Sequence, residues 1–136
     1  MSQSSWLHTA RNVHLQGKST LAAELQKRDG SWHHATIDLN NYLGNSDGKF
    51  LWNGTNFAAT ARDTKIEDRR PQSFEAWILA TLQEADGVWP QGTDSAGLNI
   101  TDALKNEDGN FVCGMAYMEI EEEYEFSVTE DYRNWE

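Results

Sequence analysis

The sequence predicts an all-β domain of two similar halves, on three observations. Short segments of alternating apolar and polar residues, typical of half-buried strands, are separated by turn pairs such as Asp29-Gly30 and Asp47-Gly48. Motifs in the first half of the chain recur in the same order in the second half. The length of 136 residues suits one domain with one core. We therefore expect a pseudo-symmetric tandem repeat of short antiparallel sheets and hairpins with short helical turns.

The first copy is predicted to form a three-stranded meander, a helical turn and a hairpin, in that order. Its expected strands are residues 12–15, 20–26 and 32–37, separated by breaks at 17–19 and 29–30. Leu39 and Leu43 lie four residues apart behind Asp38, which can cap a single helical turn. The turn at 45–48 then leads into a hairpin strand over 49–52.

The second copy aligns with the first in three collinear blocks. The blocks pair residues 6–12 with 57–63, 25–32 with 82–89, and 39–50 with 100–111. The offset between the copies grows from 51 to 57 to 61, which locates two insertions in the second copy, at 67–73 and 90–97. Both insertions contain proline, a residue typical of loops. Residues 74–83 have a helix-like composition, but the repeat predicts a strand there.

The negative charge is concentrated near the C-terminus. Of a formal net charge of -11, residues 114–136 carry eight acids and one base, whereas residues 1–113 carry 14 acids and 10 bases. Apolar residues alternate with acids from Ala116 to Val128, which predicts an added C-terminal strand docked with its acids toward solvent. The alternative is a disordered acidic tail. We divide the chain into a domain over 1–113 and an acidic extension over 114–136.

The composition excludes several classes of partner. The acid excess repels nucleic-acid phosphates and anionic membrane surfaces, and no apolar run reaches the length of a membrane span. The N-terminus lacks the basic and apolar regions of a signal peptide, and the one cysteine, Cys113, has no partner within the chain. We expect a cytoplasmic or non-classically released protein that binds no nucleic acid, inserts into no membrane and needs no cofactor.

Three segments, residues 9–17, 21–32 and 37–52, carry a family likeness, with motifs such as Asn45-Ser46-Asp47-Gly48-Lys49-Phe50. They resemble the cyanovirin-N homology family of lectins, and the resemblance extends over residues 5–113 and includes the tandem duplication. It implies an elongated all-β domain with repeats over about 5–52 and 56–113. It also implies that strands of one repeat complete a sheet with the other, so that neither half exists alone.

Secreted members of that family carry a disulfide in each half, and this sequence departs from them. The matching positions hold Ala10 with Leu25, and Ala61 with Leu82. A disulfide contributes about 2 to 4 kcal/mol, and burial of a leucine side chain roughly 1.5 to 3 kcal/mol. The apolar pairs can therefore replace the cross-links, as in the disulfide-free branch of the family.

The resemblance implies one sugar-binding pocket at each end of the molecule. The positions that match the first pocket are His8, Thr9, Gln26, Arg28, Asn106 and Asp108. The polar positions that match the second are Asn45, Asp47, Thr55, Asn56, Thr60 and Gln83. Side chains of this kind exchange hydrogen bonds with sugar hydroxyls. Gly44, Ala59 and Ala85 replace polar side chains of the second pocket, and the insertion at 67–73 is expected near its rim, so we expect the second pocket to be the weaker one.

Structural roles are the alternative for these residues. Asn45, Asp47, Asn106 and Asp108 lie in turn motifs where such side chains bond to the nearby backbone, and His8, Gln26 and Arg28 suit solvated strands. Trp32, Trp89, Phe50 and Phe111 are expected in the core. The pair His33-His34 is not expected to bind a metal, because adjacent strand residues face opposite sides of a sheet.

The leading hypothesis is a lectin that recognises mannose-rich or related neutral glycans, as oligosaccharides or on glycoproteins, without catalysis. The sequence holds no nucleophile elbow, phosphate-binding glycine loop or metal-ligand spacing, so no catalytic residue is expected. A monomer is expected, with a domain-swapped dimer about residues 52–56 as the alternative. The rival hypothesis is a sugar-silent protein-interaction domain on the same fold, which uses the insertions and the acidic C-terminal segment.

Overall fold

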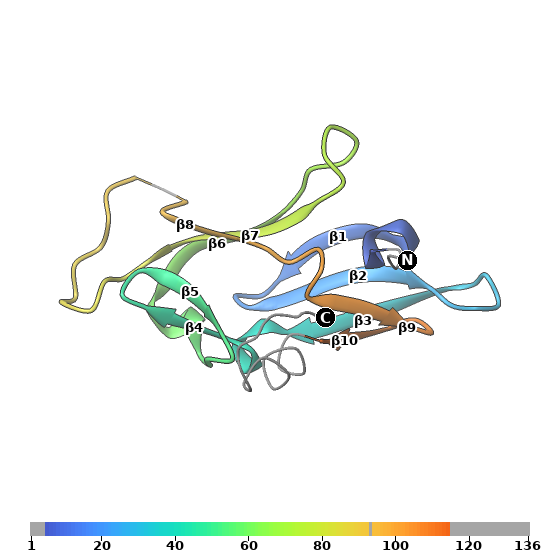
Figure 1. Cartoon of the computed structure of the whole chain (residues 1–136), viewed down its shortest axis with the longest axis horizontal. Coiled ribbons are helices and arrows are strands. Elements are labelled where there is room, and N and C mark those ends of the chain that lie inside the picture. Colours follow the sequence, from blue (N-terminus) through green and yellow to red (C-terminus); the bar gives the residue numbers. More distant parts are fainter. Residues whose placement is uncertain (1–4, 93, 115–136) are drawn as a thin grey trace, which may run out of the picture.

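The computed structural model describes residues 5–92 and 94–114, which form strands and short 3-10 turns. The elements of the first copy are η1 (Trp6–Thr9), β1 (Ala10–Gln16), β2 (Thr20–Gln26), β3 (Trp32–Asp38), η2 (Leu39–Asn41), β4 (Leu43–Ser46) and β5 (Lys49–Trp52). Those of the second are η3 (Phe57–Thr60), β6 (Ala61–Asp68), β7 (Ala76–Leu82), β8 (Ala96–Asn99), β9 (Leu104–Glu107) and β10 (Asn110–Cys113). Figure 1 shows that they form an elongated molecule. The predicted all-β repeat is confirmed.

Each copy contributes an antiparallel three-stranded meander and a two-stranded hairpin. The order β1-β2-β3 matches β6-β7-β8, and the hairpin β4-β5 matches β9-β10. Both first strands carry a bulge at an equivalent position, where Asn12 and Asp63 adopt positive φ angles of 60° and 57°. Asn and Asp tolerate this left-handed conformation better than other non-glycine residues. The bulge, which was not predicted, is thus an inherited feature of the repeat.

The strand predicted over 74–83 from the repeat is confirmed as β7. All its residues but Trp77 are buried, so the strand lacks the alternation of a half-exposed one. A strand covered on both faces gives a continuous apolar run, which explains its helix-like composition. The short turns η1 and η3, which open the two copies, were not predicted. Ser5 caps η1 by accepting a hydrogen bond from the Leu7 amide at 3.0 Å.

The hairpins are exchanged between the copies. The hairpin β9-β10 of the second copy packs beside η1 and β3, and the hairpin β4-β5 of the first copy packs beside η3 and β8. We call η1, β1–β3, β9 and β10 half I, and η3, β6–β8, β4 and β5 half II. Equivalent aromatic pairs seal the exchange. Trp6 meets Phe111 at a ring separation of 5.2 Å, and Phe57 meets Phe50 at 5.4 Å. Each hairpin packs as a separate two-stranded sheet and does not extend the meander.

The positions of the missing disulfides face one another across paired strands. Ala10 lies opposite Leu25 in the register of β1 and β2, and Ala61 lies opposite Leu82 in that of β6 and β7. Both leucines are fully buried, and Cys113 is a free thiol. The apolar pairs therefore fill the space at which a cross-link would join the strands.

The expected core positions of two tryptophans are wrong. Trp32 keeps 37% of its surface exposed and Trp89 is half-buried. The Arg11 guanidinium lies 4.0 Å from the ring centroid of Trp32, and that of Arg62 lies 4.3 Å from Trp89. Each tryptophan therefore lies at the surface under an arginine from the first strand of the meander of its own copy, a cation-π arrangement that both copies share. Phe50 and Phe111 pack on the core but are only partly buried.

The first insertion lies on half I and not near the second pocket, which corrects the expectation. It connects β6 to β7 and projects above η1, as the yellow-green loop of Figure 1 shows. The Arg70 guanidinium donates hydrogen bonds to the carbonyls of Leu7 at 2.7 Å and Ala10 at 3.2 Å. Phe74 stacks on His8 with ring centroids 4.1 Å apart. The first insertion, a loop of the second copy, therefore contacts η1 and the start of β1 in the first copy.

The C-terminal strand predicted within 114–136 lies outside the described residues, except for Gly114, whose amide donates to the Ala103 carbonyl at 2.8 Å. Over the part of the chain that is described, none of the helical segments has the length and apolar character needed to cross a membrane.

Candidate functional site

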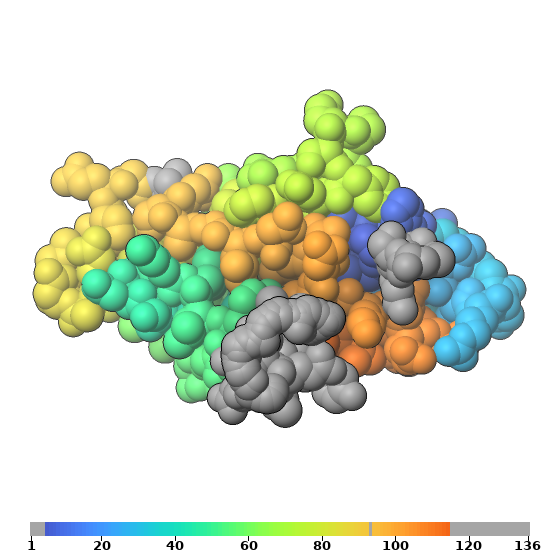
Figure 2. Space-filling view, in the orientation of Figure 1, coloured from blue at the N-terminus to red at the C-terminus, as the bar shows by residue number. Residues whose placement is uncertain are grey.

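A cleft of about 380 Å³ opens at the end of half I. Its lining comes from three elements that are far apart in the sequence, namely η1 with its N-cap, the end of β2 with its following turn, and the hairpin β9-β10. The lining residues are Ser5, Trp6, Thr9, Gln26, Lys27, Arg28, Lys105, Asn106, Glu107 and Asp108. Figure 2 shows the loop after β2, in light blue, beside the orange hairpin at this end of the molecule. Five of the six residues predicted for the first pocket line this cleft.

Asn106 ties the three walls of the cleft together. Its Nδ2 donates to Thr9 Oγ1 at 2.8 Å and to the Gln26 carbonyl at 2.9 Å, and its Oδ1 accepts from the Gly109 amide at 2.7 Å. Gly109 has a φ of +91°, and a Cβ there would lie 2.8 Å from Lys27 Cγ. The turn after β9 therefore requires glycine, and it packs against the loop of the other copy.

Arg28 and two acids form the outer wall of the cleft. Asp108 Oδ1 accepts from the Arg28 amide at 2.9 Å, and the Arg28 guanidinium lies 3.2 Å from Glu107 and 3.8 Å from Asp108. All three side chains are well exposed. Exposed ion pairs contribute little to stability, so this network mainly fixes the position of polar groups at the rim.

His8, the sixth residue predicted for the first pocket, is not among the residues that line the cleft. Its ring is stacked on Phe74 of the first insertion. Thr9, one residue later, faces the cleft, because neighbouring residues of the tight η1 turn point in different directions. The position of the insertion in the tertiary structure therefore determines that His8 contacts Phe74 while Thr9 faces the cleft.

The loop between β2 and β3 is held by its own carboxylate. Asp29 accepts hydrogen bonds from the Ser31 hydroxyl at 2.6 Å and from the Ser31 amide at 2.9 Å. The hydroxyl hydrogen bond is the main reason why the pKa of Asp29 lies below its usual value. Gln26 Nε2 donates to the Gly30 carbonyl at 3.2 Å across the same loop. The loop that carries Lys27 and Arg28 is therefore ordered without a ligand.

The end of half II repeats the polar framework of the cleft. Asn45 Nδ2 donates to Thr60 Oγ1 and to the Gln83 carbonyl, both at 2.8 Å, and its Oδ1 accepts from the Gly48 amide at 2.8 Å. Asp47 Oδ1 accepts from the Ala85 amide at 2.8 Å, as Asp108 does from Arg28. The structure thus brings Asn45, Asp47, Thr60 and Gln83 together as predicted.

The other positions predicted for the second pocket contribute differently. Thr55 and Asn56 are exposed in the segment before η3, and neither shares a hydrogen bond with the framework of Asn45 among the described residues. Gly44 packs closely on the backbone, because a Cβ at this position would lie 3.1 Å from Gly54 Cα and 3.2 Å from the Thr55 amide nitrogen. Ala59 and Ala85 stand where half I has His8 and Arg28. This end keeps the framework and lacks the charged wall.

The cleft of half I contains residues that the sequence analysis missed, namely Ser5, Trp6, Lys27, Lys105 and Glu107. Each is a direct neighbour in sequence, or one turn away, of a residue that was predicted. Extending every predicted position to its neighbours would have found Lys27, Lys105 and Glu107, but not Ser5 and Trp6.

His33 and His34 lie next to each other on β3. His33 Nδ1 makes a hydrogen bond with the Gly109 carbonyl at 2.8 Å, and His34 lies opposite Glu24 in the register of β2 and β3. Within residues 5–92 and 94–114, no group of three or more His, Cys, Asp or Glu side chains could hold a metal ion.

Comparison with known proteins places this geometry in context. The family model of the CVNH domain matches residues 6–112. A cyanovirin-N homolog of Neurospora crassa is 30% identical over 94 residues, which cover 69% of this chain and 81% of the relative. A designed cyanovirin-N homolog lectin superposes with a TM-score of 0.71 at 29% identity, over 81% of this chain and 99% of that one. Microvirin, solved as a complex with mannobiose, superposes with a TM-score of 0.69 at 26% identity, over 82% of this chain and 100% of its own.

Proposed function

The chain belongs to the CVNH domain family, and on that premise we propose that it is a non-catalytic lectin that binds mannose-rich or related neutral glycans in the cleft of half I. The observation that carries the proposal is the convergence of Thr9, Gln26 and Arg28 with the hairpin β9-β10 on one cleft. These groups are donors and acceptors of the kind that sugar hydroxyls need. The mannobiose complex of microvirin, a structural relative, supports the choice of sugar.

The cleft suits binding because its frame is formed before a ligand arrives. Asn106 and Asp108 fix the relative positions of the two copies, and the hydrogen bonds of Asp29 hold the loop between β2 and β3. Groups that are already ordered lose little conformational entropy when a ligand binds. The side chains of Gln26, Lys27 and Arg28 then remain at the rim to contact hydroxyls.

An NMR titration with mannobiose tests the proposal. We expect amide shifts at Thr9, Gln26 and Asn106, and we expect Gln26→Ala to weaken binding about fivefold to tenfold through the loss of one hydrogen bond. Gln83→Ala removes the equivalent side chain of half II and is the matched control, with unchanged binding in half I. The absence of shifts at these amides with millimolar mannobiose would contradict the lectin proposal and favour the protein-interaction rival.

A further inference from the structure

The two ends of the molecule share a polar framework but differ in charge. The cleft of half I is lined by three cations, Lys27, Arg28 and Lys105, and two acids, Glu107 and Asp108. In the alignment of the copies, the positions of the three cations are occupied in half II by Glu84, Ala85 and Gly44. Half II therefore has an acid and two uncharged residues where half I has three positive charges.

The acids of the half I cleft are already engaged. Arg28 lies within 3.2 Å of Glu107 and 3.8 Å of Asp108, so its guanidinium compensates part of their charge. Lys27 and Lys105 take part in no ion pair among the described residues. Their ammonium groups are therefore available to a ligand, and the lining carries one excess positive charge in a domain that is acidic as a whole.

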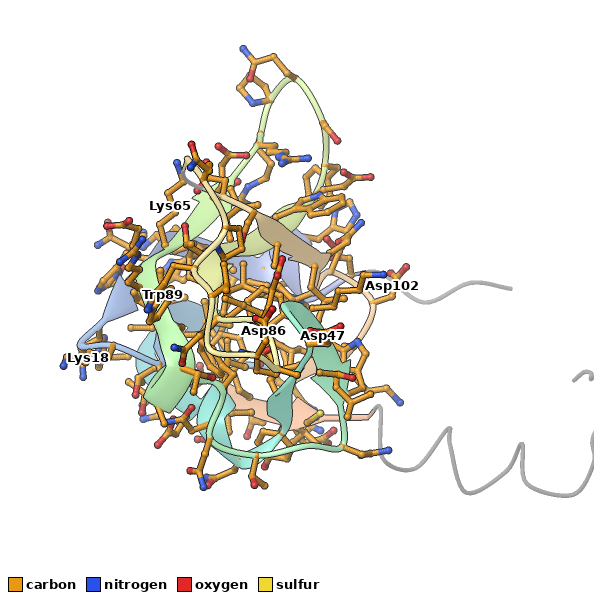
Figure 3. All side chains as sticks on the ribbon, turned by 90° about the vertical axis from the view of Figure 1, so that its left-hand side faces the viewer. Lys18, Asp47, Lys65, Asp86, Trp89 and Asp102 are labelled. Atoms are coloured by element: carbon orange, nitrogen blue, oxygen red, sulfur yellow. The ribbon has the colours of Figure 1, made fainter. Side chains whose placement is uncertain are left out.

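The end of half II has the opposite character. Figure 3 faces this end and shows the labelled Asp47 and Asp86 at the centre of the view. Glu84, two residues before Asp86, lies against the turn that carries Asp47, since its methylene carbon Cγ would be 3.3 Å from a Cβ on Gly48. The negative charge of these side chains disfavours the binding of anionic ligands at this end of the molecule.

We propose that the cleft of half I selects sugars that carry an anionic substituent, a phosphate, sulfate or carboxylate on a mannose-type hexose, over their neutral parents. The hydroxyl-binding frame positions the sugar ring, and Lys27 with Lys105 receives the anionic group. Lysine binds such groups as a point charge, and charge-assisted hydrogen bonds are stronger than those between neutral groups. This inference rests on the proposed binding of mannose-type glycans in the same cleft.

Parallel NMR titrations with mannose, mannose 6-phosphate and inorganic phosphate test the inference. At low salt we expect mannose 6-phosphate to bind about tenfold more tightly than mannose, through one charge-assisted contact. High salt should reduce this preference to about twofold, because exposed charges are screened. The amides of Asn45, Asp47 and Gln83 in half II serve as an internal control and should not respond to the phosphate.

Two variants locate the effect. The double variant Lys27→Gln with Lys105→Gln should remove the preference for the phosphorylated sugar, so that it binds mannose and mannose 6-phosphate equally. Lys18→Gln makes the same chemical change at an exposed lysine outside this cleft and should keep the preference. The half II amides also report whether each variant keeps its fold.

Three results would overturn the inference. The first is equal binding of mannose and mannose 6-phosphate at low salt. The second is inorganic phosphate binding as tightly as mannose 6-phosphate, which would indicate an anion site with no sugar selectivity. The third is a preference that survives the double lysine variant. Shifts with mannobiose but no tightening by phosphate would defeat this inference alone, whereas the absence of any mannobiose shift would defeat the proposed function as well.

Discussion

Asn106 and Asn45 are positioning residues in their two halves more than ligand-binding ones. An asparagine side chain has two N–H donors and one carbonyl oxygen. In each case both donors are used across the copies and the oxygen accepts a turn amide. These asparagines therefore have the structural role that was the alternative in the sequence analysis. The side chains that can still form hydrogen bonds with a ligand are those of Gln26, Lys27 and Arg28 at the rim.

Asp68 couples the stability of the protein to pH. The Arg70 guanidinium, which hydrogen-bonds to both of its carboxylate oxygens, holds the pKa of Asp68 below its usual value. A lowered folded-state pKa gives stability that is present above the unfolded value near about 3.9 and is lost as the pH falls through the folded value. The same contact raises the pKa of Arg70, which stays charged throughout.

We predict that Asp68→Asn lowers the free energy of unfolding by about 1 to 3 kcal/mol at neutral pH, as expected when a charged hydrogen-bond partner is lost. The difference from wild type should shrink as the pH falls below about 4. Urea unfolding at a series of pH values measures it. Asp102→Asn changes an exposed carboxylate that forms no ion pair among the described residues, and it should show no such trend. A pH-independent difference for Asp68→Asn would contradict this explanation.

At the scale of elements, the first insertion fills a groove that stays open in the other half. In half I, the Arg70 side chain fills this groove and donates hydrogen bonds to the carbonyls of Leu7 and Ala10. The equivalent positions of half II, Ala58 and Ala61, line an open cleft of about 370 Å³. Gly17, which follows β1, also lines this cleft and has no side chain to fill it. The insertion therefore adds stabilising contacts to half I that have no counterpart in half II.

We predict that Arg70→Ala lowers the free energy of unfolding by about 2 to 4 kcal/mol, since it leaves Asp68 and two carbonyls without their partner. Arg69→Ala is the matched control from the same loop. Arg69 pairs with Glu67 at 2.6 Å and lies over Trp77, both on its own hairpin, so its loss should cost about 1 kcal/mol or less. Urea denaturation of both variants gives the comparison, and equal losses would show that the contact with η1 contributes nothing.

At the scale of the whole molecule, the exchanged hairpins make the two copies interdependent. Trp6 needs Phe111 from the other copy, and Phe57 needs Phe50. Trp6 is 2% exposed and Phe57 fully buried, so separating the copies would expose two large aromatic side chains together with much of the core. The link between the two copies, between β5 and η3, lies within residues 52–56, about which a domain-swapped dimer is the alternative to the expected monomer, and the oligomeric state stays a prediction.

We predict that a fragment of residues 1–53 alone is unfolded, because its meander lacks β9-β10 and its hairpin lacks η3. Mixed with a fragment of residues 54–114, it should recover a folded spectrum, since the two supply each other's missing parts. Amide dispersion in two-dimensional NMR spectra measures both results. A well-dispersed spectrum from residues 1–53 alone would show that one copy is a complete folding unit.

Local patterns predicted most of the architecture. Alternation placed β1, β2 and β3 within a few residues of their ends, because strand burial repeats every two residues, and the duplication identified β7 against its own composition. The apolar pairs Ala10 with Leu25 and Ala61 with Leu82 lie opposite each other in the structure. The family likeness predicted six residues for the first pocket, and five of them line the cleft of half I.

The sequence by itself determined the duplication, most of the strands and their turns, because these depend on contacts between neighbours along the chain and on a repeat that can be aligned. Only the tertiary structure decided that Trp32 lies at the surface under Arg11, that the first insertion reaches His8, and that Lys105 joins Lys27 in one cleft. These contacts join residues that are far apart in sequence or on different sheets. Side-chain periodicity carries no information about them, since it specifies which face is buried and not what buries it.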